Sequence, residues 1–228
     1  MKKIVILTGA GMSAESGLKT FREMGGIWEQ YDVTEVASPQ GWRQHPQVVL
    51  DFYNQRRKQL FESAPNAGHY GLAELEKQFN VQIITQNVDD LHERAGSSNI
   101  LHLHGELKKV RSTLDASLVY EMDQWELKLG DTCEKGAQLR PHIVWFGEAV
   151  PAMETAIPLA SSADIFVVIG TSLNVYPAAG LLNDAPAHVP IYLIDPGEPA
   201  FTPSEQITHI KEVASTGVQK LTELLLNH

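Results

Sequence analysis

The sequence predicts an α/β fold in which a parallel sheet is buried on both faces. The first observation is a series of short apolar, β-branched runs, which are typical of strands covered on both sides. The second is that segments with helical spacing separate several of these runs, and such alternation is the pattern of an α/β fold. The expected strands are Ile4 to Thr8, Val81 to Thr85, Ile100 to Leu103, His142 to Trp145, Ile165 to Gly170 and Ile191 to Ile194.

Helices are expected where apolar residues recur every three or four positions. These segments are Val48 to Leu60, the stretch after Gly68 as far as Phe79, and Val218 to Leu225. Two stretches do not fit the alternation: residues 21–79 are long for a single crossover, and residues 105–140 are weakly patterned. We therefore expect a large domain of residues 1–20, 80–104 and 142–228, with residues 21–79 and 105–141 forming a small inserted domain.

Charge and cysteine content restrict the function classes. The 228 residues carry 18 Lys and Arg against 28 Asp and Glu, a net charge of −10. Such an acidic chain argues against binding to nucleic acid or to anionic membranes as the main function. The single cysteine, Cys133, can form neither an internal disulfide nor a four-cysteine zinc site. No apolar stretch approaches the roughly 20 residues of a membrane-spanning helix, so we expect a cytoplasmic protein.

Five of the expected strands end in glycine or polar side chains. The carboxyl ends of parallel strands share one edge of a sheet, where ligands bind, so these residues predict a single crevice. Turn formation explains any one of the ends, but five together, one with a histidine, favour a site. The residues are Gly9, Ala10, Gly11, Gln86, Asn87, Asp89, His104, Gly170, Thr171, Ser172 and Asp195.

Residues 9–14 satisfy the pattern G-x-G-x-x-G/A directly after a strand. There glycines let the backbone approach a pyrophosphate at the start of a helix. A dehydrogenase also needs an acidic residue at the end of a second strand about 20 residues further on. The stretch from Ile27 to Asp32 has no clear strand. The pattern therefore favours a use of a dinucleotide other than hydride transfer.

Three further sets of residues leave two interpretations open. His104 is either structural, like His102 on the same face, or a general base beside a nucleotide. Tyr53 and Arg56 share a helix face and can clamp a carboxylate, although their spacing alone favours a solvated face. Residues 145–148 either offer an edge to a peptide or form a core strand that ends in a turn.

Longer motifs make a family resemblance specific. They are Gly9 to Arg22, Thr85 to Asp89, His104-Gly105, Arg140 to Glu148 and Gly170 to Ser172. In order and content they resemble the sirtuins, which are NAD-dependent protein lysine deacylases, and they span nearly the whole chain.

The resemblance implies a Rossmann-like, doubly wound large domain and a small domain, with NAD and an acyl-lysine peptide entering the cleft from opposite sides. His104 would be the general base on a ribose hydroxyl as the acyl group passes to ADP-ribose. Asn87 and Asp89, counted with His104 as catalytic, would hold the nicotinamide and ribose. The cofactor-binding residues implied are Gly9, Ala10, Gly11, Ala14, Glu15, Thr20, Phe21, Arg22, Trp28, Gln86, Asn87, Asp89, Gly170, Thr171, Ser172, Asp195 and Ala214.

The resemblance also implies a substrate site. Val144, Phe146, Gly147 and Glu148 would pair with the substrate backbone as an added strand. Ala37, Tyr53 and Arg56 look like the subgroup that removes succinyl, malonyl or glutaryl groups, which reverses the preference from spacing alone. The small alanine leaves room, and Tyr53 with Arg56 would bind the distal carboxylate. Because the chain is acidic, Arg56 must act locally.

Three departures from the family pattern stand out. Most sirtuins hold a structural zinc with two Cys-x-x-Cys pairs, but this chain has only Cys133 there and no histidine between His104 and His142. We therefore expect no zinc. Lys19 replaces the usual proline and should loosen the cofactor loop, and Asp195 replaces the usual asparagine and should weaken NAD binding. The module without zinc would be held by apolar packing of Leu107, Val110, Leu114, Leu118, Trp125 and Leu127.

The leading hypothesis is an NAD-dependent protein deacylase with desuccinylase and demalonylase as well as deacetylase activity. The alternatives are an NAD glycohydrolase or ADP-ribosyltransferase, and a module that binds NAD or ADP-ribose without turnover. The expected partners are acyl-lysine proteins or peptides, with no nucleic acid and no membrane. We expect a monomer.

Overall fold

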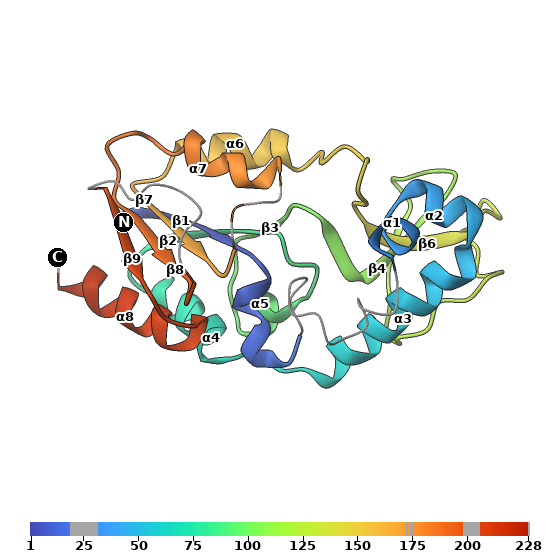
Figure 1. Ribbon diagram of the computed structural model, residues 1–228, viewed down its shortest axis with the longest axis horizontal. Coiled ribbons are helices and arrows are strands. Elements are labelled where there is room, and N and C mark those ends of the chain that lie inside the picture. Colours follow the sequence, from blue (N-terminus) through green and yellow to red (C-terminus); the bar gives the residue numbers. More distant parts are fainter. Residues whose placement is uncertain (19–31, 172, 174–175, 198–205, 228) are drawn as a thin grey trace.

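The computed structural model describes residues 1–18, 32–171, 173, 176–197 and 206–227. Within them, six parallel strands form one sheet in the order β3-β2-β1-β7-β8-β9 (Figure 1). These strands are β1 Lys3–Thr8, β2 Asn80–Thr85, β3 Ile100–His102, β7 Ile165–Ile169, β8 Ile191–Ile194 and β9 Ile207–Ile210. The chain runs outward from β1 to β3, then returns to β7 on the other side of β1. This confirms the doubly wound sheet and places its switch point between β1 and β7.

Both faces of the large sheet are buried. In β1, Ile4 and Ile6 belong to one core cluster, and Val5 and Leu7 belong to the other. Helices α4 Ala67–Leu75 and α8 Ala214–Leu226 cover the first face, and α6 Met153–Ser161 and α7 Leu181–Asp184 cover the second (Figure 1). This arrangement explains why the strands read as continuous apolar runs rather than as alternating ones.

A smaller module lies at the other end of the molecule (Figure 1). Its sheet has the order β5-β4-β6 and is antiparallel. Its elements are α1 Val33–Val36, α2 Pro39–Gln44, α3 Pro46–Glu62, β4 Gly105–Ser112, β5 Val119–Glu121 and β6 Leu139–Ile143. Proline in the first turn of α2 and of α3 favours the start of each helix. An N–H group at that position has no partner within the helix, so proline, which lacks it, loses no hydrogen bond. A short helix, α5 Leu91–Arg94, follows the loop after β2.

The prediction that residues 142–145 form a strand of the large sheet is wrong. The strand there is β6, which ends at Ile143 and pairs antiparallel with β4 in the small sheet. An apolar run indicates a strand but does not indicate its sheet. Gly105 explains the difference: it has a positive φ of 82°, and a Cβ atom there would lie 2.0 Å from His142 O. This turn directs the chain out of the large sheet into β4. The domain boundaries themselves stay a prediction.

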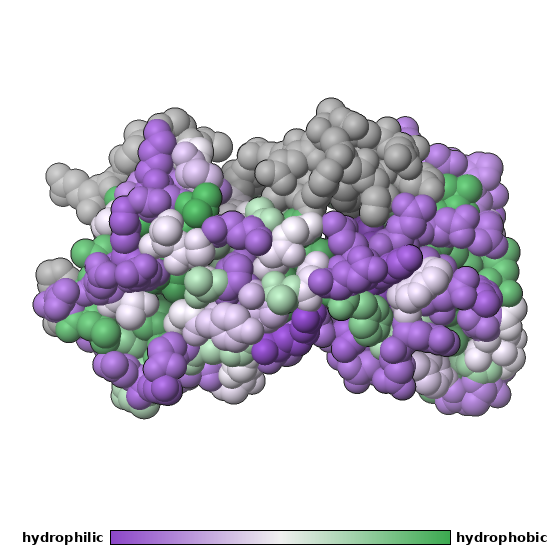
Figure 2. All heavy atoms as spheres, turned by 90° about the horizontal axis from the view of Figure 1, so that it is seen from below, coloured by the Kyte–Doolittle hydropathy of each residue, from purple (hydrophilic) through white to green (hydrophobic). Residues whose placement is uncertain are grey.

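Figure 2 shows one face of the molecule, on which hydrophilic side chains are spread over both halves and apolar ones form small patches. Among the described residues, no helix is both long enough and apolar enough to cross a membrane.

Candidate functional site

Glycines bring the backbones after β1 and β7 into contact. The Gly9 N–H donates to Ile169 O at 2.9 Å, and the Gly11 N–H donates to Gly170 O at 2.8 Å. A Cβ atom at Gly11 would lie 2.6 Å from the Cα atom of Gly170. Gly170 has a φ of 61°, and its own Cβ would lie 2.4 Å from the Met12 nitrogen. Only glycine fits at Gly11 and Gly170. We call Gly9, Gly11 and Gly170 the glycine cradle, and its lack of side chains suits the close approach of a pyrophosphate.

Ser13 joins the two polar residues expected after β2. Asn87 Nδ2 donates to Gly9 O at 3.0 Å and to Ser13 Oγ at 3.1 Å. Ser13 Oγ in turn donates to Asp89 Oδ2 at 2.9 Å. Asn87, Asp89 and the glycine cradle therefore form one connected network, and that this network lines a single ligand crevice stays a prediction. Ser13 was not among the expected site residues, although it lies inside the glycine motif.

Asp89 is buried, and burial raises the pKa of its carboxyl group. Hydrogen bonds from the Ser13 hydroxyl and the Leu91 N–H, together with the charge of His102, oppose that rise. The carboxylate is thus held by donors that favour its ionised form.

The hydrogen bond of His104 leaves one nitrogen of its ring able to accept a proton. Its Nδ1 lies 3.1 Å from Gln86 O. Because a carbonyl oxygen can only accept, Nδ1 carries the ring proton and Nε2 keeps its lone pair. Burial lowers the pKa of His104 below its usual value, against the hydrogen bond to Gln86. The ring is therefore neutral at pH 7, which is the form that can accept a proton.

Gln86 and Thr171 link the histidine to the glycine cradle, since Gln86 Nε2 donates to Thr171 Oγ1 at 3.2 Å. The structure thus brings together residues from the ends of β1, β2, β3 and β7. These are Gly9, Gly11, Gln86, Asn87, Asp89, His104, Gly170 and Thr171.

Other expected cofactor residues lie around this network. Glu15 accepts hydrogen bonds from the Ser215 N–H and hydroxyl at 2.9 and 2.6 Å, next to Ala214 at the start of α8. Asp195 follows β8, and its Oδ1 accepts from the Gly197 N–H at 2.8 Å. Ala10 and Ala14 begin two short 3₁₀ turns, η1 Ala10–Met12 and η2 Ala14–Ser16. Five expected residues and one departure lie outside the described residues: Thr20, Phe21, Arg22, Trp28, Ser172 and Lys19.

A second set of contacts surrounds Tyr53 in the small module. Tyr53 is buried on α3, and its hydroxyl accepts a hydrogen bond from Trp145 Nε1 at 3.0 Å. The Arg140 guanidinium lies over the indole ring of Trp145, 3.4 Å from its centre. Glu148 accepts from both terminal nitrogens of Arg140, at 2.7 and 3.1 Å. Sequence reasoning missed the roles of Arg140 and Trp145, although both lie in a motif it singled out.

Both members of the expected carboxylate clamp are hydrogen-bond donors at neutral pH. Burial raises the pKa of Tyr53 to about 12. Arg56 is half-buried, with its guanidinium 5.7 Å from the centre of the Phe52 ring. Burial lowers the pKa of Arg56, while Tyr53 and Asp89 oppose that effect.

Residues 144–148 follow β6 as a loop. Its N–H groups already donate within the chain: Val144 to His104 O at 2.9 Å, Phe146 to Ala37 O at 3.0 Å and Glu148 to Trp145 O at 3.0 Å. The Glu148 carboxylate holds Arg140 and the Trp145 N–H. An added substrate strand would therefore rely mainly on carbonyl groups of this loop, and that pairing stays a prediction.

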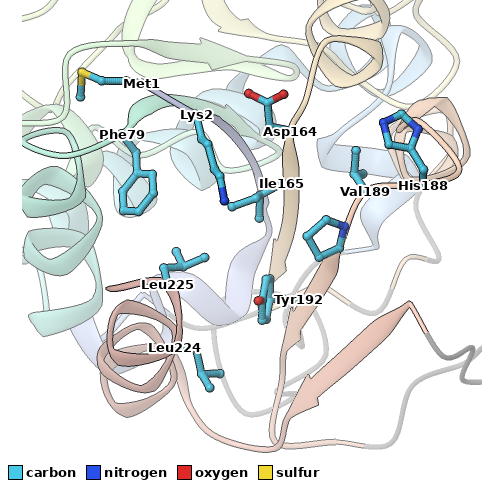
Figure 3. A pocket seen from close by; sticks show the side chains of 11 residues that line it. Met1, Lys2, Phe79, Asp164, Ile165, His188, Val189, Tyr192, Leu224 and Leu225 are labelled. Atoms are coloured by element: carbon cyan, nitrogen blue, oxygen red, sulfur yellow. The ribbon is translucent and has the colours of Figure 1, made fainter. Parts of the chain in front are cut away.

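A cavity of about 540 Å³ lies elsewhere (Figure 3). It is lined by Lys2, Asp164 and Ile165 at the amino ends of β1 and β7, and by Leu224 and Leu225 of α8. The site residues lie at the carboxyl ends of the strands, so this cavity is not part of the site.

The donor set does not fit a structural zinc. Cys133 Sγ donates to Ser112 Oγ at 3.2 Å. In the part of the chain that the structure describes, no three His, Cys, Asp or Glu side chains lie close enough to hold a metal ion. That no zinc is bound stays a prediction.

The fold and site are those of a class of doubly wound nucleotide-binding proteins. In this chain a neutral histidine, His104, is linked to the glycine cradle, and a small module lies beside the large sheet. A sequence model of the Sir2 family matches residues 9–177. The chain belongs to the Sir2 family.

The relatives and solved structures agree with this assignment. The chain is 57% identical to an NAD-dependent protein deacylase of Bacteroides thetaiotaomicron, over 99% of each protein. It is 56% identical to one of Helicobacter pylori, over 99% of this chain and 96% of that protein. A Sir2 homologue in complex with NAD has a TM-score of 0.90 and 39% identity, covering 99% of this chain and 90% of the other. A Sir2 protein with a deacetylated p53 peptide and 3′-O-acetyl ADP-ribose has a TM-score of 0.80 and 30% identity, covering 97% and 92%.

Proposed function

We propose that the protein is an NAD-dependent protein lysine deacylase, which transfers the acyl group from lysine to ADP-ribose and releases nicotinamide. The observation that carries this proposal is the His104 ring, whose Nδ1 proton is used by Gln86 O and whose Nε2 is left as a base. The family membership and the names of the relatives support the same reading.

When bound, NAD supplies the ribose carbon whose nicotinamide is displaced by the acyl oxygen. The chain's own residues have separate roles around that chemistry. The Gly9, Gly11 and Gly170 cradle leaves room for the pyrophosphate. Asn87 and Asp89, fixed through Ser13, would orient the nicotinamide and ribose. His104 Nε2 would take the proton from a ribose hydroxyl, which makes that oxygen a better nucleophile.

We further propose a preference for acidic acyl groups such as succinyl and malonyl. Trp145 Nε1–H fills an acceptor position of the Tyr53 hydroxyl, so the Tyr53 proton is available to a ligand. Arg56 would add a charged two-point hydrogen bond to the same distal carboxylate. Ala37 is small and buried, and its carbonyl fixes the loop that carries Trp145. The acyl preference of this chain thus rests on neighbouring donors that stay protonated.

The substrates would be acyl-lysine side chains of proteins or peptides that lie along residues 144–148. We also propose that the protein acts as a monomer in the cytoplasm. A molar mass of one chain by light scattering during size exclusion would agree with a monomer, and twice that mass would contradict it.

Nicotinamide release tests the function directly. It would be measured with NAD alone, with an acetyl-lysine peptide and with a succinyl-lysine peptide, while peptide mass is followed in parallel. We expect release to depend on the peptides and to match the loss of acyl mass, fastest with the succinyl peptide. Release that ignores the peptides would identify an NAD glycohydrolase instead. Binding of NAD with no release at all would identify a module without turnover.

A further inference from the structure

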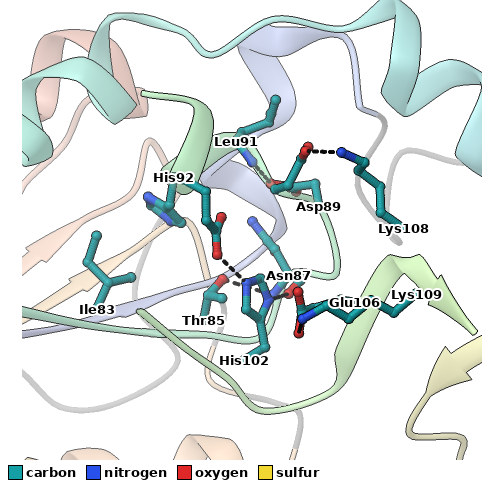
Figure 4. Close-up of polar contacts among 12 residues, drawn as sticks. Ile83, Thr85, Asn87, Asp89, Leu91, His92, His102, Glu106, Lys108 and Lys109 are labelled. Atoms are coloured by element: carbon teal, nitrogen blue, oxygen red, sulfur yellow. Dashed lines mark hydrogen bonds and ion pairs between the residues drawn. The ribbon is translucent and has the colours of Figure 1, made fainter. Parts of the chain in front are cut away.

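The ring of His102 lies between two hydrogen-bond acceptors. It is next to Asn87, which with Asp89 forms the proposed nicotinamide end of the site. Nδ1 is 3.1 Å from Asn87 O, and Nε2 is 2.8 Å from Glu93 Oε1. Figure 4 shows the His102 ring next to Asn87. Neither a carbonyl nor a carboxylate oxygen has a proton to donate, so both ring nitrogens must donate. Only the charged imidazolium form of histidine does this.

The groups that face the ring from α5 and β4 favour that charge. Burial alone would lower the pKa of His102, but the hydrogen bond and charge of Glu93 raise it above the usual value, with help from Glu106. Lys109 Nζ donates to Glu106 at 2.8 Å and so offsets part of the negative charge of Glu106 (Figure 4). The hydrogen-bond geometry and the surrounding charges therefore both favour the imidazolium form of His102.

The charge also acts on two buried groups near the ring. It lowers the pKa of Asp89, against the rise that burial causes. It also lowers the pKa of His92 on α5, in the same direction as burial and the nearby His69. His102 thus helps to keep Asp89 negative and His92 neutral.

The contact with Asn87 completes the support of that residue. The Asn87 N–H donates to Thr85 Oγ1 at 3.0 Å, its carbonyl accepts from His102, and its side chain donates to Gly9 and Ser13. The His102 bond fixes the orientation of the peptide plane that leads from Asn87 toward Asp89. Without this donor, the Asn87 carbonyl would lose that hydrogen bond and the peptide plane would lose one restraint on its orientation.

We propose that His102, charged and paired with Glu93, is a positioning residue for the cleavage of NAD, because it holds Asn87 in place and keeps Asp89 ionised. The inference rests on the proposed deacylase function. It makes the nicotinamide-releasing step sensitive to the protonation of His102. It leaves the choice of acyl group unchanged, because the ring is bonded to the nicotinamide end.

The first test is NMR of the histidine ring nitrogens in the free protein. We expect both His102 nitrogens to be protonated at pH 7. In the Glu93→Gln variant, the amide oxygen still accepts from Nε2 but carries no charge, so the titration midpoint should fall by at least about one pH unit. Glu74→Gln makes the same change on an exposed residue away from the site and should leave the midpoint unchanged. A single ring proton on wild-type His102 at pH 7 would overturn the proposal.

The second test is the pH profile of nicotinamide release. The alkaline limb of the Glu93→Gln profile should move to lower pH by the same interval as the NMR midpoint. His102→Gln should lower kcat about tenfold with both acyl peptides and leave the peptide KM unchanged. If that variant does not fold, Glu93→Gln still decides, because the Glu93 side chain is 40% exposed. An NMR shift with an unmoved rate profile would show a structural role only and overturn the proposal.

The failure of the proposed function would look different. In that case the wild-type protein would show the doubly protonated ring but no release of nicotinamide that depends on an acyl peptide. This outcome would also remove the catalytic role of His102.

Discussion

The proposed nicotinamide end of the site, at the strand ends, and the proposed acyl end, around Tyr53, are built in different ways. The first is held by backbone contacts of glycines and by hydrogen bonds to Asn87, Asp89 and His104 at strand ends. The second is held by stacked and hydrogen-bonded side chains, in which Trp145 contacts Tyr53 and Arg140. We therefore expect the chemical step and the acyl preference to be separable. A change at the strand ends should affect every substrate, and a change around Tyr53 should affect acidic acyl groups selectively.

The largest effect on the deacylation rate is expected from His104→Ala, at the strand ends. Without the Nε2 base, deacylation should fall by about 10²–10⁴-fold for acetyl and succinyl peptides alike. Steady-state rates with both peptides measure this, and a thermal unfolding scan checks that the fold is kept. A loss confined to one acyl group would contradict this expectation, because it would give the strand-end histidine a role in acyl choice.

The next effect is expected from Arg56→Met at the acyl end. Loss of the charged hydrogen bonds should lower kcat/KM for the succinyl peptide about tenfold to 100-fold and spare the acetyl peptide. Lys58→Met is the matched control, because it removes an exposed cation from the same helix. Equal losses for both peptides would show that Arg56 supports the fold and does not read the carboxylate.

A smaller effect is expected from Trp145→Phe. The variant keeps an aromatic ring near Arg140 but removes the N–H that orients the Tyr53 hydroxyl. The KM for the succinyl peptide should rise about threefold to tenfold, with the acetyl KM unchanged. Trp42→Phe, at a ring whose centre lies 5.8 Å from that of Trp145, controls for loss of indole packing. A rise of both KM values would mean that Trp145 holds the peptide backbone instead.

The smallest expected effect is a change in the free energy of unfolding with pH. Burial lowers the pKa of His69 to about 4 and that of the adjacent His92 well below its usual value. Between about pH 6.5 and 4 the unfolded chain therefore binds more protons than the folded one, and the free energy of unfolding should fall as pH falls. The slope should approach about 1.4 kcal/mol per pH unit for each histidine.

Denaturant unfolding at pH 7, 6 and 5 measures that slope. His69→Gln should flatten it, while His188→Gln, an exposed histidine, should not. An unfolding free energy that is constant over this range in the wild-type protein would show that these rings do not stay neutral.

The strand ends could be predicted from sequence because their signals are local. Apolar runs such as Ile4 to Thr8 indicate strands, and the residue after each strand falls on the shared edge by topology alone. By contrast, β9 was not predicted, because Thr208 and His209 interrupt its apolar pattern.

The acyl end was only partly predictable. The spacing of Tyr53 and Arg56 singled them out, and the resemblance favoured a carboxylate clamp. The Trp145–Tyr53 hydrogen bond, however, joins residues 92 positions apart. Likewise, His102 was read as packing because its partner Glu93 comes from a different element. Contacts of this kind depend on how elements pack, and no spacing rule along the chain reveals them.

If both ends of the site act in one reaction, the nucleotide product carries the acyl group, and its mass shows whether it does. With NAD and a succinyl-lysine peptide, we expect a succinyl ester of ADP-ribose in equal amounts with nicotinamide and free lysine peptide. Plain ADP-ribose beside an unchanged succinyl peptide would contradict it.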